Sequence, residues 1–163
     1  MNLETGPPTS GGLLIDANLL VLFTVGTVNR NRIESFKRTR RYARTDYDLL
    51  LRVMERFNPL YTVAHVLAEV SNLTDLSGPE RSLAREVLRK TISLLSEVAM
   101  PSAYAAEEPL YDRLGLVDAS IGAVARSQRC TVLTDDLDLY LLLASQKVEV
   151  INFTHLRAYE WRA

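Results

Sequence analysis

Four acidic residues stand where apolar segments meet turns, or at the edge of an apolar helix: Asp16, Glu69, Asp118 and Asp136. Asp16 ends the run 12–15, and Asp118 and Asp136 follow other short apolar stretches. Carboxylates that are buried close together are costly unless a cation neutralises them. Mg²⁺ and Mn²⁺ prefer oxygen ligands of this kind. If the fold brings these four side chains together, they form a metal-dependent site.

Each acid also has a structural explanation. Asp118, Asp135 and Asp136 could each cap a helix, because an acid in the first turn accepts hydrogen bonds from free N–H groups. Glu69 could be a solvated helix carboxylate. Its position argues for more, because it lies at the edge of the apolar stripe of its helix and can reach into a cleft.

Short apolar strands alternate with helical patterns along the chain. We expect strands at 13–16, 60–63, 98–100, 131–133 and 148–153, and helices at 18–25, 45–57, 64–76, 79–97, 107–113, 118–128 and 136–145. Gly26 is interpreted as the stop of the first helix, and Thr45 with Asp48 as a capping box that opens the second. The alternation predicts an α/β domain with a mainly parallel sheet.

Length and composition are those of one soluble domain. The 163 residues are 47% hydrophobic and 24% charged, and we expect a flexible lead-in over 1–11 followed by a single domain over 12–163. The lone Cys130 excludes an intrachain disulfide and suits a reducing cytoplasm. Because no stretch approaches ~20 apolar residues, we expect a cytoplasmic protein that does not enter a membrane.

Four short segments, at 14–20, 66–73, 114–121 and 132–136, together resemble the PIN-domain family of ribonucleases. Each is weak alone, but their order and spacing extend over nearly the whole chain. The chain is most similar to small bacterial and archaeal members, many of which are toxins of type II toxin–antitoxin pairs. The resemblance implies a three-layer α/β/α sandwich around a central, mainly parallel sheet.

The resemblance also implies a site. It assigns catalysis and the binding of Mg²⁺ or Mn²⁺ to Asp16, Glu69, Asp118 and Asp136, with Asn18 and Thr134 as accompanying polar residues. For the fourth acid, Asp136 is preferred over its near neighbours Asp135 and Asp138, because it stands two residues after Thr134 as the family pattern places it.

The activity that follows from the resemblance is metal-dependent endoribonuclease cleavage of RNA phosphodiester bonds. The expected partners are RNA, a protein antitoxin and a second copy of the chain. The alternative is a PIN-like RNA-binding or scaffold protein that has lost catalysis.

A basic segment over 29–44 could bring RNA to this acidic site. It holds seven basic residues against the single acid Glu34, namely Arg30, Arg32, Lys37, Arg38, Arg40, Arg41 and Arg44. Within it, Arg38, Arg40 and Arg41 are the candidates for holding the phosphate backbone, and the interleaved Phe36 and Tyr42 could stack a base. The alternative is a solvated charged loop.

Other enzyme classes fit the chain less well. A phosphatase of the haloacid-dehalogenase type would need a second aspartate where the chain has Asn18. There is also no glycine-rich phosphate loop and no Ser/His/Asp motif, which disfavours nucleoside triphosphatases and serine hydrolases.

Overall fold

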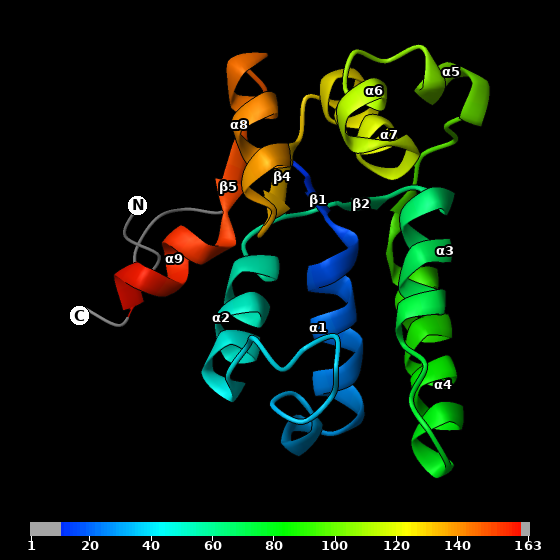
Figure 1. The fold of residues 1–163 in the computed structure, drawn as a ribbon, viewed down its shortest axis with the longest axis vertical. Helices are drawn as coiled ribbons and strands as arrows, with labels where there is room; N and C mark the ends of the chain where they lie inside the picture. The colour runs from blue at the N-terminus through cyan, green and yellow to red at the C-terminus, as the bar shows by residue number, and fades with distance from the viewer. Residues whose placement is uncertain (1–10, 161–163) are drawn as a thin grey trace.

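Five parallel strands form the centre of the computed structural model, which describes residues 11–160 (Figure 1). The sheet order is β3-β2-β1-β4-β5, and every neighbouring pair is parallel. The strands are β1 (Leu13–Ile15), β2 (Leu60–Thr62), β3 (Ser96–Glu97), β4 (Thr131–Thr134) and β5 (Val150–Asn152). Apart from Gly11, the predicted lead-in lies outside the described residues.

Helices cover both faces of this sheet. In Figure 1, α1 to α4 lie on one side and α5 to α8 on the other, which gives the predicted three-layer α/β/α architecture. The helices are α1 (Ala17–Val28), α2 (Arg44–Met54), α3 (Ala64–Leu73), α4 (Pro79–Leu94), α5 (Ser102–Ala106), α6 (Tyr111–Leu114), α7 (Leu116–Gln128), α8 (Leu137–Ser145) and α9 (Phe153–Glu160), with a 3₁₀ turn η1 (Arg30–Arg32) after α1. None of the helices within 11–160 is long and apolar enough to cross a membrane.

The central strand β1 explains why the sheet is covered on both sides. Leu13, Leu14 and Ile15 are all at most 1% exposed, so both of its faces are buried. A continuous apolar run is the pattern of a parallel strand between two helical layers. Asp16 directly follows β1 and so lies at the carboxyl edge of the sheet, where ligands bind in α/β folds.

Gly26 does not end the first helix, contrary to the sequence-based expectation. The helix α1 continues to Val28, and Gly26 is buried against the ring of Tyr47 on α2. A β-carbon at this position would lie 2.3 Å from Tyr47 Cδ2. The glycine therefore permits close packing of α1 and α2, a role that helical periodicity does not reveal.

Several other boundaries differ from those expected. The third strand is the two-residue β3 rather than 98–100, and the expected strand 148–153 is shorter and leads directly into α9. The expected helix 107–113 is replaced by the short helices α5 and α6. The start of α2 is one residue earlier, where the Asp46 carboxylate accepts a hydrogen bond from the Ala43 N–H (2.7 Å), so the predicted capping box was wrong.

Candidate active site

A pocket of about 260 Å³ opens at the carboxyl edge of the sheet, and its lining includes all four predicted acids. They come from four parts of the fold: the β1–α1 turn, α3, α7 and the β4–α8 turn. We call it the acidic pocket; it is lined by Asp16, Ala17, Asn18, Glu69, Leu114, Leu116, Val117, Asp118 and Asp136. Thr134 lies behind it, and the predicted acids and Asn18 are brought together here.

Asp16 is the most buried acid of the pocket, with 4% of its surface exposed. One of its carboxylate oxygens accepts a hydrogen bond from the Leu19 N–H (2.9 Å) and so caps α1. The other accepts from the Thr134 hydroxyl and from the Asp135 N–H (3.2 Å). Burial, and then the charge of Asp135, raise the pKa of Asp16 to about 7.

Asp118 lies in the first turn of α7 but does not cap it. Its carboxylate, like that of Glu69, has no hydrogen bond or ion pair with any residue in the described part of the chain. Burial, and then the charges of Asp136 and Glu69, raise the pKa of Asp118 to about 7. The carboxylates of Asp118 and Glu69 therefore face the other pocket acids without a hydrogen-bond donor or cation from the described residues.

Asp136 caps the helix α8 and also lines the acidic pocket. One of its oxygens accepts hydrogen bonds from the N–H groups of Asp138 (2.8 Å) and Leu139 (3.0 Å), which caps α8. Its own N–H donates to the Thr134 hydroxyl (3.0 Å). Since that hydroxyl donates to Asp16, Thr134 ties two of the pocket acids to each other.

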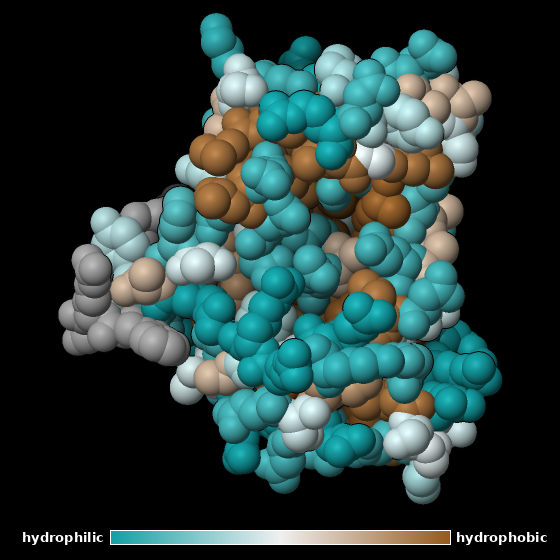
Figure 2. Space-filling model, viewed as in Figure 1, coloured by the Kyte–Doolittle hydropathy of each residue, from teal (hydrophilic) through white to brown (hydrophobic). Residues whose placement is uncertain are grey.

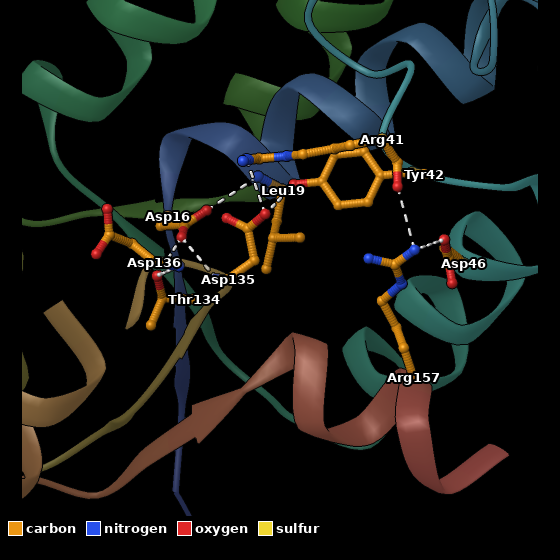
Figure 3. A network of polar contacts seen from close by, with 9 residues as sticks. All are labelled: Asp16, Leu19, Arg41, Tyr42, Asp46, Thr134, Asp135, Asp136 and Arg157. Carbon is orange, nitrogen blue, oxygen red and sulfur yellow. Dashed lines mark hydrogen bonds and ion pairs between the residues drawn. The ribbon is translucent and has the colours of Figure 1, made fainter. Parts of the chain in front are cut away.

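The neighbouring Asp135 is turned to the other side of Asp16, away from the acidic pocket (Figure 3). It accepts hydrogen bonds from the Tyr42 hydroxyl and from Arg41 (2.8 Å). Burial, and then the charge of Asp135, raise the pKa of Tyr42. The geometry thus separates the two adjacent acids, and Asp136 is the one that lines the pocket.

The donors of the pocket fit a hard divalent cation. Within residues 11–160, no three acidic, histidine or cysteine side chains are already close enough to hold one ion. The available donors are nevertheless carboxylate oxygens, and two of the carboxyls have pKa values raised first by burial and then by neighbouring acids. Binding a divalent ion would relieve that repulsion, and the unpartnered Glu69 and Asp118 are free to turn toward it.

The basic segment over 29–44 is largely tied to the protein itself. Ion pairs join Arg30 to Asp48 (2.9 Å), Arg32 to Glu80 (2.8 Å), Lys37 to Asp75 (2.9 Å) and Arg41 to Asp135 (2.8 Å). Arg38 and Arg40 are exposed and form no ion pair with any residue of the described ranges. Two of the three predicted RNA-binding arginines are therefore exposed and outside the ion pairs of the described residues.

The predicted base stacking by the segment's aromatic residues was wrong. Phe36 is 8% exposed and Tyr42 is 2% exposed, so neither ring can accept a base. Tyr42 instead packs edge-on against Phe153 of α9, with ring centroids 6.4 Å apart. Alternating charged and aromatic residues did not reveal that the rings face the core.

A largely buried ion pair between α9 and α2 was missed by the sequence reasoning. Arg157 of α9 binds Asp46 of α2 (2.8 Å) and donates to the Arg41 carbonyl oxygen (3.1 Å). The two residues are 111 positions apart in the sequence. No local pattern pairs them, since α9 itself was not expected.

Comparisons with known proteins agree with the geometry. A family model described as PIN domain matches residues 13–142, a range that includes all four acids of the pocket. Neither the curated proteins nor the solved structures contain a significant match to the chain.

Proposed function

The chain belongs to the PIN-domain family, whose members are generally nucleases, and we therefore propose that it is a metal-dependent endoribonuclease. The observation that carries the proposal is the convergence of Asp16, Glu69, Asp118 and Asp136 on one pocket from four parts of the fold. The raised pKa values of two of them mark a site that favours a bound cation.

PIN domains typically use divalent metal ions, and the four pocket acids would hold Mg²⁺ or Mn²⁺ here. When bound, such an ion lowers the pKa of an attacking water and stabilises charge on the phosphate. Asp118 or Glu69, whose carboxylates have no hydrogen-bond partners within 11–160, can accept the proton of that water. Thr134 keeps Asp16 oriented through its hydroxyl.

RNA is the proposed substrate because the exposed basic segment reaches one of the acids of the pocket through Arg41 and Asp135. Arg38 and Arg40 are free to bind phosphates, and Arg41 is held beside Asp16 through Asp135. Such cations offset the repulsion between a polyanion and the pocket. In Figure 2, hydrophilic residues predominate over the lower part of the view, where α1 and α2 lie in Figure 1, and hydrophobic residues gather in the upper part, over α6 to α8.

Cleavage of a labelled single-stranded RNA in Mn²⁺ tests the proposal. We expect wild type to cleave it, EDTA to abolish cleavage, and Asp118→Asn to lower the rate by about a hundredfold or more. Asp138→Asn is the matched control, because Asp138 is exposed and does not line the pocket. Equal cleavage by all variants would reveal a contaminating nuclease. Binding without cleavage would favour the alternative of an inactive RNA-binding protein.

We further propose that the enzyme is a toxin that pairs with a protein antitoxin and forms a homodimer. The support is the resemblance to small prokaryotic relatives, together with an exposed apolar face on α8, where Leu137 is 54% and Leu141 is 53% exposed. Induced expression should arrest growth for wild type and not for Asp118→Asn. Light scattering should give the mass of a dimer. Normal growth with wild type would refute the toxin role, and a monomer mass would refute the dimer.

A further inference from the structure

Asp135 is a buried carboxylate that touches the catalytic machinery without lining the acidic pocket. Its side chain is 4% exposed, and one of its oxygens has no hydrogen-bond partner within the described part of the chain. The other oxygen accepts from the Tyr42 hydroxyl and from Arg41. The Asp135 N–H donates to Asp16 (3.2 Å), so one residue contacts both Arg41 and a pocket acid (Figure 3).

Arg41 is held by this carboxylate with most of its hydrogen-bonding capacity unused. One terminal nitrogen binds Asp135 at 2.8 Å, and the guanidinium lies 5.0 Å from the centre of the Tyr42 ring. The side chain is nevertheless 53% exposed, and its other N–H groups bind no acidic residue of the described ranges. A guanidinium has five N–H donors, so it can bind a carboxylate and a phosphate together.

The backbone under Arg41 is fixed as well. Arg157 donates to the Arg41 carbonyl oxygen (3.1 Å) and pairs with Asp46 (2.8 Å), and Tyr42 is almost fully buried. Arg40, one position earlier, is exposed and has no ion pair within 11–160. The two neighbouring arginines therefore differ: one is preorganised beside Asp16 and the other is a free surface cation.

We propose that Asp135 is a positioning residue that holds Arg41 beside Asp16, where Arg41 binds a phosphate of the RNA. The proposal rests on the proposed function and deepens it. Fixing an arginine in its binding conformation strengthens binding, because less side-chain entropy is lost when the ligand arrives. Asp135 then contributes to affinity for RNA although it carries the same charge as the substrate.

The sign of the effect of Asp135→Asn on RNA affinity tests this role. Removing a negative charge near a polyanion site should strengthen binding if charge alone matters. Positioning through Arg41 predicts the opposite, a Kd about tenfold weaker, as expected for loss of one charge-assisted hydrogen-bonded contact. Asp138→Asn is the matched control, since it makes the same charge change at an exposed site and should not weaken binding.

The measurement is fluorescence anisotropy of a labelled single-stranded oligoribonucleotide in EDTA, where nothing is cleaved. Arg41→Gln should weaken binding about tenfold, and the double variant Asp135→Asn/Arg41→Gln should be no weaker than Arg41→Gln alone. Arg40→Gln is the comparison variant: it removes a phosphate-binding cation that no residue holds in place, so it should weaken binding less, by about twofold. The comparison of Arg41→Gln with Arg40→Gln does not depend on Asp135→Asn folding, because both side chains are largely exposed.

Several results would overturn the proposal. They are an Asp135→Asn affinity equal to or tighter than that of Asp138→Asn, multiplicative losses of affinity in the double variant, or equal losses of affinity for Arg40→Gln and Arg41→Gln.

The shift in melting temperature on adding Mn²⁺ gives a readout that does not depend on RNA. Asp135→Asn should keep the wild-type shift, and a lost shift would make Asp135 a metal ligand instead. Wild type that binds RNA without cleaving it would refute hydrolysis and leave the role of Asp135 intact, whereas failure to bind RNA would refute both.

Discussion

At the scale of single residues, the acidic pocket is defined by carboxylates that lie close to one another, two of which, Glu69 and Asp118, have no hydrogen-bond partner within 11–160. Asp16 is hydrogen-bonded but buried, whereas Asp118 is only half-buried and has no partner within 11–160. Burial, and then the charges of neighbouring acids, raise the pKa of both carboxyls to about 7. An uncompensated charge of this kind makes stability depend on pH and on cations.

The metal-free protein should lose stability as the pH rises from about 4 to about 7. The pKa of Asp118 is raised from 3.8 to about 7 in the folded chain, so between these values the folded state holds the additional proton. The free energy of unfolding therefore falls across this window, and Mn²⁺, which binds the deprotonated form, should stabilise more at its upper end.

Thermal midpoints of wild type and Asp118→Asn between pH 5 and 8, in EDTA and in Mn²⁺, measure this effect. The difference between the two proteins isolates the Asp118 contribution. At pH 8 in EDTA, Asp118→Asn should be the more stable by on the order of 1 kcal/mol, because Asp118 is partly exposed and its repulsion is screened. A wild-type Mn²⁺ shift that is the same at pH 5.5 and pH 8 would contradict the account.

The hydroxyl of Thr134, rather than the shape of its side chain, should determine both protein stability and RNA cleavage. Thr134→Val removes the bridge between Asp16 and the Asp136 N–H, which leaves buried groups unpaired and should cost about 1–3 kcal/mol of stability. RNA cleavage should fall as well, because Asp16 loses its orientation. Thr134→Ser keeps the hydroxyl and is the control, and denaturant unfolding gives the comparison. Equal stability of Thr134→Val and wild type would show that the bridge does not hold the site together.

At the scale of elements, close packing of helices positions the residues that follow the strands. Gly26→Ala should destabilise the protein by about 1–3 kcal/mol, because its β-carbon would overlap the Tyr47 ring at 2.3 Å. The matched control is Gly122→Ala in α7, where a β-carbon meets side chains only at 3.4 Å or beyond and the helix gains propensity. Thermal unfolding that ranks the two in the reverse order would contradict this packing.

The helix α9 is joined to α2 by two ion pairs of different burial. Arg157→Gln should cost about 2–3 kcal/mol, because Asp46 is 2% exposed and would lose its cationic partner in the interior. Arg52→Gln breaks the exposed pair with Glu160 and should change stability by less than about 1 kcal/mol. Urea unfolding separates the two cases. Equal effects would show that burial does not decide the strength of these pairs.

The elements that were predicted correctly are those with a strong local signal. The buried strands β1 and β4 and the helix α3 have continuous or periodic apolar patterns, and each begins at the expected residue, although α3 ends three residues early. The edge strand β3 is exposed and two residues long, so its position depends on pairing with β2 rather than on its own residues. Helix α9 follows β5 without a break, and its start signal is the single residue Asn152, whose side chain accepts a hydrogen bond from the His155 N–H (3.1 Å).

At the scale of the whole molecule, the parallel topology creates the site. Because β1 and β4 are neighbours, the turns after them bring Asp16 and Asp136 together, while α3 and α7 supply Glu69 and Asp118. The four acids could be nominated from the sequence, because each stands at the end of an apolar segment or on the edge of an apolar helix. The different surroundings of Asp135 and Asp136, and the burial of Tyr42, depend on contacts between distant segments and could not.

The position of a bound Mn²⁺ ion is the sharpest test of whether the acidic pocket is a metal site. We expect anomalous diffraction from crystals grown with Mn²⁺ to show a peak in the acidic pocket, within coordination distance of carboxylate oxygens from Asp16 and Asp118. Crystals of Asp118→Asn under the same conditions should show a much weaker peak. A strong Mn²⁺ peak only outside the pocket, or no peak inside the pocket at saturating metal, would show that the acidic pocket is not the metal site.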